Sequence, residues 1–368
     1  MRRHWSNCIT HFDTEVEGFI QSYFGEQERQ CLLVAAAGFD PRSQRIATML
    51  ANVLGPRLSG IFIREERGQP DPALRDRAND NAKALKALVP NCEILDVEVF
   101  GDDGAAIGGP RIAATLGALL IDPKITDIVL DMSALSIGIG FPAAKLLLSE
   151  CETVGRSFHL LIVSNPELDD NIVSEPADRP MPVKGFSGSV ALDGLLDPAR
   201  IWIPQLAKGR KAALTKIGLS VGECYKICPV VPFPARDPRR ADGLISEYEN
   251  ELVNEWQVDP RDLVYVSERN PLDCYRTLST LKQRYDKTVS GSFEPRVILS
   301  PIGSKVMAAG ALMAAIEHDL TVQYLETVRY EFNAPDDSDQ EKEDMMVHVL
   351  LSGPAYGDYD ALVRTEEI

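Results

Sequence analysis

The first half of the chain alternates short apolar runs with longer segments of helical period. The apolar runs have the length of buried strands, and the segments between them repeat apolar residues at helical spacing. The expected strands are 31–37, 58–63, 93–100, 125–130 and 158–163, and the expected helices are 45–54, 71–88, 110–120 and 141–149. Strands that alternate with helices in this way predict a parallel sheet covered by helices on both faces.

The same alternation restarts in the second half. The expected strands there are 227–231, 263–267 and 296–299, and the expected helices are 239–256, 272–285 and 304–317. The β-rich segment 320–332 is expected to form a C-terminal β-hairpin with 346–351, across the acidic loop 335–344. The predicted fold class is therefore α/β, with two Rossmann-like, doubly wound halves in tandem.

Residues 164–200 interrupt the alternation with repeated prolines and glycines, and a segment so punctuated is typical of a functional loop or a connection between domains. We therefore predict a first domain over 1–163, a connecting segment over 164–200 and a second domain over 201–368.

Two short sequence echoes relate the halves. Gly38-Phe-Asp-Pro-Arg-Ser43 follows the first expected strand of one half, and Ala235-Arg-Asp-Pro-Arg-Arg240 follows the first expected strand of the other. Later, Asp131-Met-Ser-Ala-Leu-Ser136 and Ser300-Pro-Ile-Gly-Ser-Lys305 each lead into an Ala-rich helix. Two echoes in the same order, each at a strand-to-helix turn, predict an internal duplication.

These echoed turns are the candidate binding segments, because open parallel sheets bind ligands beyond the carboxyl ends of their strands. Asp40 suits a helix cap, which places Arg42 and Ser43 beside free backbone N–H groups that favour an anion. The alternative is a well-made helix start with Arg42 in solvent. The same two interpretations apply to Asp237-Pro238-Arg239-Arg240.

Gly303, Ser304 and Lys305 form the strongest of these segments. Glycine allows close approach of the backbone, serine offers a hydroxyl, and lysine adds a positive charge at a helix start, which together suit a phosphate. The P-loop spacing is absent, and a simple helix start with a surface lysine remains the alternative. Asp131 is expected either to bond a ribose or to tie its loop to backbone amides. The predicted ligand-binding residues are Gly38, Asp40, Arg42, Ser43, Asp131, Ser133, Ser136, Arg236, Arg239, Ser300, Gly303, Ser304 and Lys305.

Composition narrows the classes of partner. A net charge of −17 argues against broad binding to duplex DNA, although basic residues outnumber acidic ones between residues 200 and 305. No apolar run is long enough to span a membrane and no signal peptide is evident, so we expect a cytoplasmic protein. The seven cysteines are scattered, and Cys224 and Cys228 have no partner pair at zinc spacing. We expect no disulfide framework, metal or cofactor.

Catalytic patterns are incomplete. The five histidines are dispersed, and none lies in a recognisable nucleophile setting. His159 falls inside an expected strand and is expected to be a core or edge residue. Glu268, at a strand end, is expected to belong to a charged rim. These features favour a binding protein over an enzyme.

The turns at 38–43 and 131–136 resemble those of the CRISPR-associated Rossmann fold (CARF) sensor domains. Gly303-Ser304-Lys305 is similar to their Gly-Thr-Lys motif, and the two halves resemble the duplicated SAVED domains of bacterial anti-phage systems. The first half has Ala134-Leu135-Ser136 at the position of that motif and so lacks the lysine.

The resemblance implies a defence sensor that binds a nucleotide-derived anion, such as a cyclic oligonucleotide, in a cleft between the halves and acts through a protein partner, the effector. Two alternatives remain open. One is a phosphoester-cleaving enzyme that acts on such a nucleotide, and the other is an assembly subunit that has kept the fold and lost the ligand.

Overall fold

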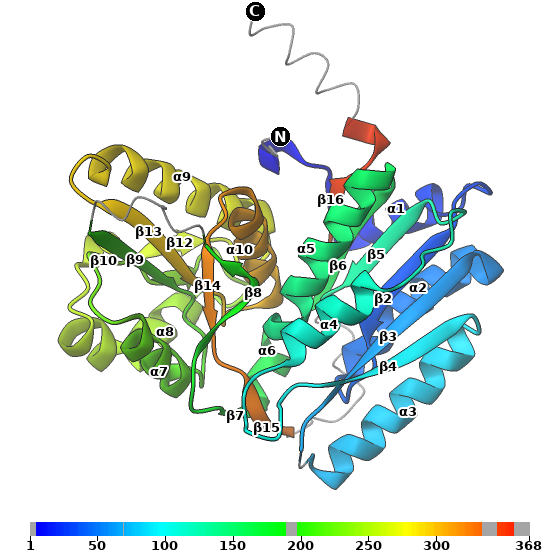
Figure 1. The fold of residues 1–368 in the computed structure, drawn as a ribbon, viewed down its shortest axis with the longest axis horizontal. Helices are drawn as coiled ribbons and strands as arrows, with labels where there is room; N and C mark the ends of the chain where they lie inside the picture. The colour runs from blue at the N-terminus through cyan, green and yellow to red at the C-terminus, as the bar shows by residue number, and fades with distance from the viewer. Residues whose placement is uncertain (1–4, 69, 189–196, 333–343, 357–368) are drawn as a thin grey trace, which may run out of the picture. The chain divides into compact units, whose positions relative to one another are not determined.

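The computed structural model describes residues 5–68, 70–188, 197–332 and 344–356 (Figure 1). The chain divides into two compact units. Unit 1 comprises Met1–Ser6 and Asn165–Gln340, and unit 2 comprises Asn7–Ser164 and Glu341–Ile368. The chain therefore leaves unit 2 after Ser164 and returns to it near its C-terminus. None of the described helices has the length and apolar character needed to cross a membrane.

Unit 2 is built on a seven-stranded sheet of order β1-β16-β6-β5-β2-β3-β4. The last five strands in this order are parallel to one another. Strand β16 is antiparallel to β6, and β1 is antiparallel to β16. The strands are β1 Thr10–Phe12, β2 Cys31–Ala36, β3 Leu58–Glu66, β4 Cys92–Glu98, β5 Asp127–Asp131, β6 Ser157–Ser164 and β16 Met345–Ser352. The helices are α1 Thr14–Tyr23, α2 Arg45–Leu54, α3 Pro72–Leu88, α4 Gly108–Gly117 and α5 Ile137–Val154.

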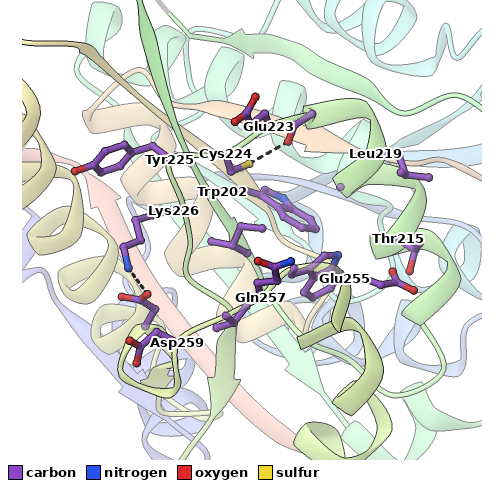
Figure 2. A pocket seen from close by; sticks show the side chains of 16 residues that line it. Trp202, Thr215, Leu219, Glu223, Cys224, Tyr225, Lys226, Glu255, Gln257 and Asp259 are labelled. Carbon is purple, nitrogen blue, oxygen red and sulfur yellow. Dashed lines mark hydrogen bonds and ion pairs between the residues drawn. The ribbon is translucent and has the colours of Figure 1, made fainter. Parts of the chain in front are cut away.

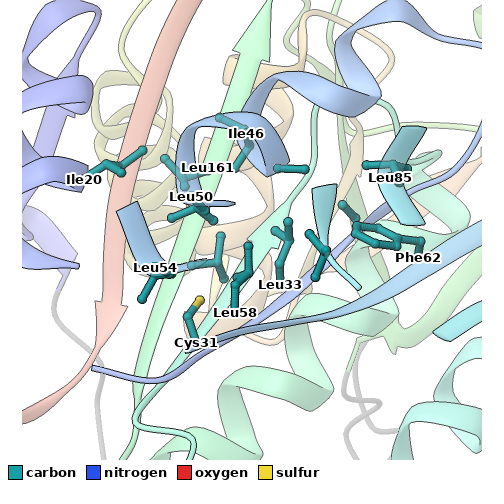
Figure 3. Packing of buried hydrophobic residues seen from close by; sticks show 14 of the residues in the cluster. Ile20, Cys31, Leu33, Ile46, Leu50, Leu54, Leu58, Phe62, Leu85 and Leu161 are labelled. Atoms are coloured by element: carbon teal, nitrogen blue, oxygen red, sulfur yellow. The ribbon is translucent and has the colours of Figure 1, made fainter. Parts of the chain in front are cut away.

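The core of unit 2 follows from the two periodicities of its sequence. Cys31 and Leu33, two residues apart on β2, point to one face of the sheet, where they meet Ile46, Leu50 and Leu54 of α2 (Figure 3). The spacing of four between these helix residues places them on one side of α2. All five side chains are at most 2% exposed, so α1, α2 and α3 bury one face of the sheet.

Unit 1 contains a five-stranded sheet of order β10-β9-β13-β14-β8, a parallel pair β11-β12 and an antiparallel pair β15-β7. The strands are β7 Ile172–Pro176, β8 Met181–Ser187, β9 Pro198–Pro204, β10 Lys226–Ile227, β11 Val230–Pro232, β12 Val264–Val266, β13 Glu294–Ser300, β14 Thr321–Tyr324 and β15 Thr327–Phe332. The helices are α6 Pro166–Asp170, α7 Lys211–Val221, α8 Arg240–Glu247, α9 Pro271–Val289 and α10 Lys305–Glu317. A parallel bridge between Gln205 and Val230 connects β11 to the residue that follows β9.

The two units share one strand order. In unit 2 the parallel strands are arranged third, second, first, fourth and fifth along the chain, and an antiparallel strand follows the fifth. Unit 1 has the same arrangement when β10 and β11, separated by two residues, are taken as one strand position, with β8 as the antiparallel strand. This is the order of the doubly wound nucleotide-binding folds. The prediction of a mainly parallel α/β fold is confirmed.

The predicted C-terminal hairpin is wrong. Strand β16 pairs with β6 and β1 of unit 2, whereas β15 pairs with β7 of unit 1. Seven of the eight residues of β16 are buried, so both of its faces are covered. A strand that is apolar on both faces requires an interior position in a sheet, and proximity along the chain does not override that requirement.

Unit 1 also begins earlier than predicted. Strand β9 and helix α7 precede the segment expected to be the first strand and are not among the predicted elements, and β7 and β8 lie inside the predicted connecting segment. Ala235-Arg-Asp-Pro-Arg-Arg240 therefore follows the second strand position, not the first. The expected helix 239–256 ends as α8 at Glu247 and continues as a short π-helical turn over Glu251–Glu255.

Candidate functional site

The carboxyl edge of unit 2 brings together two predicted segments. Strands β2 and β5 are parallel neighbours, so the turns that follow them meet at one edge of the sheet. The turn after β2 carries Gly38, Asp40, Arg42 and Ser43, and the turn after β5 carries Asp131, Ser133 and Ser136.

Arg42 does not extend into solvent and is held by Asp40. The Nε and backbone N–H of Arg42 donate to Asp40 Oδ1 at 2.9 Å, and Nη2 donates to Oδ2 at 2.7 Å. The side chains of Arg42 and Asp40 are 3% and 10% exposed. Both lie at a 3-10 turn over Pro41–Gln44 that precedes α2. The open alternative of a solvent-exposed Arg42 is therefore wrong, and the charge of this arginine is neutralised within the unit.

Asp131 is also engaged by its own loop. Its Oδ1 accepts hydrogen bonds from the hydroxyl and the backbone N–H of Ser133, and that hydroxyl in turn accepts from the Val163 N–H at 2.7 Å. Burial raises the pKa of Asp131 to about 6. Of the two roles expected for Asp131, the structure shows the tie to its own loop.

The backbone of Ser136 is also hydrogen-bonded at this edge. Its N–H donates to Glu65 Oε1 at 2.7 Å, and Glu65 pairs with Arg67 at 2.8 Å. The hydroxyls of Ser136 and Ser43 are buried and have no hydrogen-bond partner among the described residues. At the carboxyl edge of unit 2, the charged groups of Asp40, Arg42, Asp131 and Glu65 are thus bonded to groups of the same unit, whereas the hydroxyls of Ser43 and Ser136 are not.

In unit 1, Ser300, Gly303, Ser304 and Lys305 connect β13 to α10. Ser300 is fully buried, and its hydroxyl accepts from Trp202 Nε1 at 3.0 Å. Ser304 caps α10 by accepting from the Met307 N–H at 3.3 Å, and the half-buried Lys305 is the first residue of the helix. These contacts assign Ser300 to the core and leave Ser304 and Lys305 at the helix start.

Gln205 lies beside this loop of unit 1. It is not among the predicted residues, because β9, which it follows, is not among the predicted strands. Its Nε2 donates to the Met307 carbonyl at 3.1 Å, while its buried Oε1 has no hydrogen-bond partner in the described chain. A Cβ atom placed on Gly303 would lie 3.1 Å from that Oε1. Glycine at 303 therefore permits the close approach of this loop to the end of β9.

Arg236 and Arg239 lie on a different strand position from Ser304 and Lys305. They follow β11, and the strand position of β9 separates β11 from β13. Both arginines are exposed; the backbone N–H of Arg236 donates to Glu268 Oε2 at 3.1 Å, and that of Arg239 to Asp237 Oδ1 at 2.9 Å. Glu268, expected to belong to a charged rim, is buried and lies 3.7 Å from Arg240 Nε.

The carboxyl edges of the two units differ in charge. In unit 1 the turns after β9, β11, β12 and β13, each with the first residue of the next helix, carry more basic than acidic residues: Lys208, Arg210, Lys211, Arg236, Arg239, Arg240, Arg269 and Lys305 against Asp237 and Glu268. In unit 2 the corresponding turns after β2, β3, β4 and β5 carry no such excess: Arg42, Arg45 and Arg67 against Asp40, Asp71, Asp102 and Asp103. Acidic residues outside these turns pair with some of the cations of unit 1: Asp170 pairs with Lys208 and Arg240, and Glu251 pairs with Lys211. Basic residues still outnumber acidic ones at this edge of unit 1 when Asp170 and Glu251 are added to the count, and they do not at the edge of unit 2.

A cavity of about 590 Å³ lies at the opposite, amino edge of unit 1 (Figure 2). Its wall includes Trp202 and Trp256, whose rings meet edge-to-face at 5.0 Å, and Cys224, whose thiol pKa is raised to about 11 by burial. Lys226 pairs with Asp262 across 2.5 Å. The predicted ligand-binding residues do not line this cavity. In the described parts of the chain, no group of three or more His, Cys, Asp or Glu residues is arranged to hold a metal ion.

Strand order and parallel pairing define the chain as an α/β protein of two Rossmann-like units. No family model and no curated protein matches the sequence. Solved structures with some likeness include a candidate universal stress protein of Pseudomonas aeruginosa UCBPP-PA14, at 10% identity and TM-score 0.22, covering 83% of this chain and 96% of that one. A cyclopropane-fatty-acyl-phospholipid synthase-like protein of Lactobacillus casei ATCC 334 has 12% identity and TM-score 0.27, with 91% and 88% covered.

The NH3-dependent NAD synthetase of Campylobacter jejuni subsp. jejuni NCTC 11168 has 10% identity and TM-score 0.22, with 83% of this chain and 95% of that chain covered. Likenesses at these scores support no activity and no ligand for the present chain.

Proposed function

We propose that this chain is a regulatory binding protein that holds a nucleotide-derived anion at the carboxyl edge of unit 1. The observation that carries the proposal is the excess of basic residues at that edge, next to the helix start formed by Ser304 and Lys305. Backbone N–H groups at a helix start, together with a lysine, attract a phosphate, and surrounding arginines add electrostatic attraction.

In this proposal the phosphate binds at the start of α10. Lys305 supplies the positive charge, and a backbone N–H of the first helical turn that Ser304 does not cap would donate to a phosphate oxygen. Lys208 and Arg239 follow neighbouring strand positions at the same edge and would take a second phosphate of a di- or oligonucleotide. The buried Oε1 of Gln205 beside Gly303 would accept a hydrogen bond from a donor group of the ligand after a small shift of the loop.

Unit 2 has a structural role in the same proposal. Its carboxyl edge is filled by the Asp40–Arg42 pair and the Asp131–Ser133 contacts, which leaves its charges paired internally. The shared strand order of the units, with 131–136 and 300–305 both following the fourth strand, supports an internal duplication in which unit 2 has lost the ligand lysine. A partner effector would then read the state of the chain, as the resemblance to CARF and SAVED sensors implies.

The test is thermal unfolding of the full chain with a panel of mononucleotides, dinucleotides and cyclic oligonucleotides. A ligand at 100 times its dissociation constant adds about 2.7 kcal/mol to the free energy of unfolding. Lys305→Ala should abolish the shift produced by the selected nucleotide. Lys287→Ala is the matched control, because Lys287 is an exposed lysine in the last turn of α9 in the same unit.

Each other outcome favours a different function. Conversion of the nucleotide to product during long incubation would make the chain a phosphoester-cleaving enzyme. A shift that persists in Lys305→Ala would place the ligand elsewhere. The absence of a shift with every nucleotide would contradict the sensor proposal and favour an assembly subunit that has lost its ligand. The internally paired charges at the carboxyl edge of unit 2 fit that alternative.

A further inference from the structure

Three histidines that are far apart in the sequence form one hydrogen-bonded chain inside unit 2. His11 of β1 and His348 of β16 are joined through their Nδ1 atoms at 2.9 Å. His348 Nε2 lies 3.0 Å from His159 Nδ1 of β6, and His159 Nε2 lies 3.0 Å from Asp127 Oδ1 of β5. The chain therefore crosses four adjacent strands of the sheet.

The inner part of this chain is sealed from water. His159, His348 and Asp127 are fully buried, whereas His11 is half-buried. The ring of Phe19 in α1 stacks on His11 at 4.6 Å and on His348 at 4.1 Å. Solvent protons can therefore reach the buried rings most directly through His11.

The charged and titratable groups around the histidine chain keep Asp127, at its buried end, ionised. Burial alone would raise the pKa of Asp127, but hydrogen bonds from His159, Thr126 and Tyr23 outweigh it and hold that pKa below its usual value. Arg29 lies 3.7 Å from Asp127 Oδ1. Among the described residues, further groups near the histidine chain are Glu15 near His11, the Ser157 hydroxyl bonded to Tyr23, and the thiols of Cys31 and Cys151, whose pKa values are raised by burial.

The hydrogen bonds fix where the protons lie. An ionised Asp127 can only accept, so the bond to it uses the His159 Nε2–H. In the arrangement that leaves all three rings uncharged, His159 accepts at Nδ1 from the His348 Nε2–H. His348 then accepts at Nδ1 from the His11 Nδ1–H. Burial lowers the pKa of His348 well below its usual value, and a positive charge on His159 or His11 would lower it further, which agrees with a neutral central ring.

One added proton fits this chain without breaking a hydrogen bond. It binds at His11 Nε2; the His11 Nδ1 proton then passes to His348 Nδ1, and the His348 Nε2 proton passes to His159 Nδ1. These two transfers move one positive charge from His11 to His159 and conserve every proton. A second added proton would require His348 to accept at both nitrogens, so one bond must break.

We propose that His11, His348 and His159 are a one-proton relay, which carries a proton from solvent at His11 to His159 beside the Asp127 carboxylate. The relay is independent of the ligand proposal for unit 1. The middle hydrogen bond of the relay, between His348 and His159, joins β16 to β6. The polypeptide leaves unit 2 after β6 and returns to it with β16. Proton uptake reverses the direction of that bond, and a second proton breaks the chain, so unit 2 would respond to acid in two steps.

The experiment is a pH titration of the full chain with 15N-labelled histidine, followed through the ring nitrogen shifts. In the wild type, the shifts of His11 and His159 should move together with one midpoint, as one proton spreads over the relay. His318, which lies in unit 1 and outside the relay, is the internal reference. A wild-type His159 that stays neutral throughout the His11 transition would overturn the proposal, with no variant needed.

His11→Gln separates a relay from a structural hydrogen bond. The glutamine amide can still donate to His348 Nδ1 but cannot pass a proton on. In this variant the His159 shifts should no longer move over the pH range of the wild-type transition. The matched control, His318→Gln, should leave that transition unchanged. A His159 transition that persists unaltered in His11→Gln would show that protons reach it by another route.

Discussion

Asp131 shows how burial changes the chemistry that a residue type suggests. An aspartate after a parallel strand was expected to bond a ribose or tie its own loop, and the sequence did not distinguish the two roles. The structure buries the carboxyl, which makes its charge costly in the folded state, and the two hydrogen bonds from Ser133 offset only part of that cost. Arg42 is a similar case. It is predicted to attract an anion, but its positive charge is paired with the carboxylate of Asp40, two residues before it.

Unit 2 should therefore lose stability as the pH rises through about 6. The folded-state pKa of Asp131 is raised to about 6 from 3.8, so the folded state holds this proton more tightly than the unfolded state does. The resulting stabilisation is fully present below pH 3.8 and is lost as the pH rises through about 6. At about 1.4 kcal/mol per pH unit it amounts to roughly 3 kcal/mol.

Asp131→Asn should remove this dependence, because an amide oxygen can accept the same bonds without ionising. Urea unfolding of both proteins between pH 4.5 and 7.5 should show the variant gaining stability relative to the wild type as the pH rises. Asp76→Asn, at an exposed position of α3, is the control and should show no such trend. A difference between Asp131→Asn and the wild type that is the same at every pH would contradict the role of Asp131.

At the scale of elements, close helix packing explains a residue that local propensity disfavours. Gly310 lies in the middle of α10, where glycine costs about 1 kcal/mol relative to alanine. A Cβ atom there would lie 2.4 Å from the Pro271 carbonyl oxygen and 2.6 Å from Cys274 Cβ, so α9 crosses directly over this position. The sequence predicted both helices but could not show that they touch here.

Gly310→Ala should destabilise unit 1 by about 1–3 kcal/mol or more, because the helices must move apart to admit the methyl group. Gly243→Ala is the matched control in α8, where an added Cβ meets nothing within 4 Å. That variant should gain up to about 1 kcal/mol from helix propensity. Chemical denaturation followed by tryptophan fluorescence measures both, and equal effects of the two substitutions would be inconsistent with a close helix crossing at Gly310.

At the scale of the whole molecule, the return of β16 to unit 2 makes the two units separately observable. All three tryptophans, Trp5, Trp202 and Trp256, belong to unit 1. Their fluorescence therefore follows the unfolding of unit 1, while far-UV circular dichroism follows both units. The predicted hairpin would instead have made β16 part of unit 1.

Val349→Asp should destabilise unit 2 by several kcal/mol and leave the tryptophan transition in place. Val349 is fully buried in β16 opposite Leu160 of β6, and a charge placed there cannot be hydrated. Val322→Asp in β14 is the mirror-image control and should shift the tryptophan transition instead. If Val349→Asp moved the fluorescence midpoint as far as the circular dichroism midpoint, the assignment of β16 to an independently unfolding unit 2 would fail.

The sequence by itself determined the fold class and most of the elements of unit 2, because apolar period and turn residues are local signals. Helix α2, for example, covers the predicted residues 45–54. Only the tertiary structure decided which strands and side chains contact one another. It placed β16 beside β6, Arg42 against Asp40, Gln205 beside Gly303, and three dispersed histidines in one chain. These outcomes depend on which distant segments share a sheet face or edge, and strand pairing between segments far apart in the sequence leaves no local pattern.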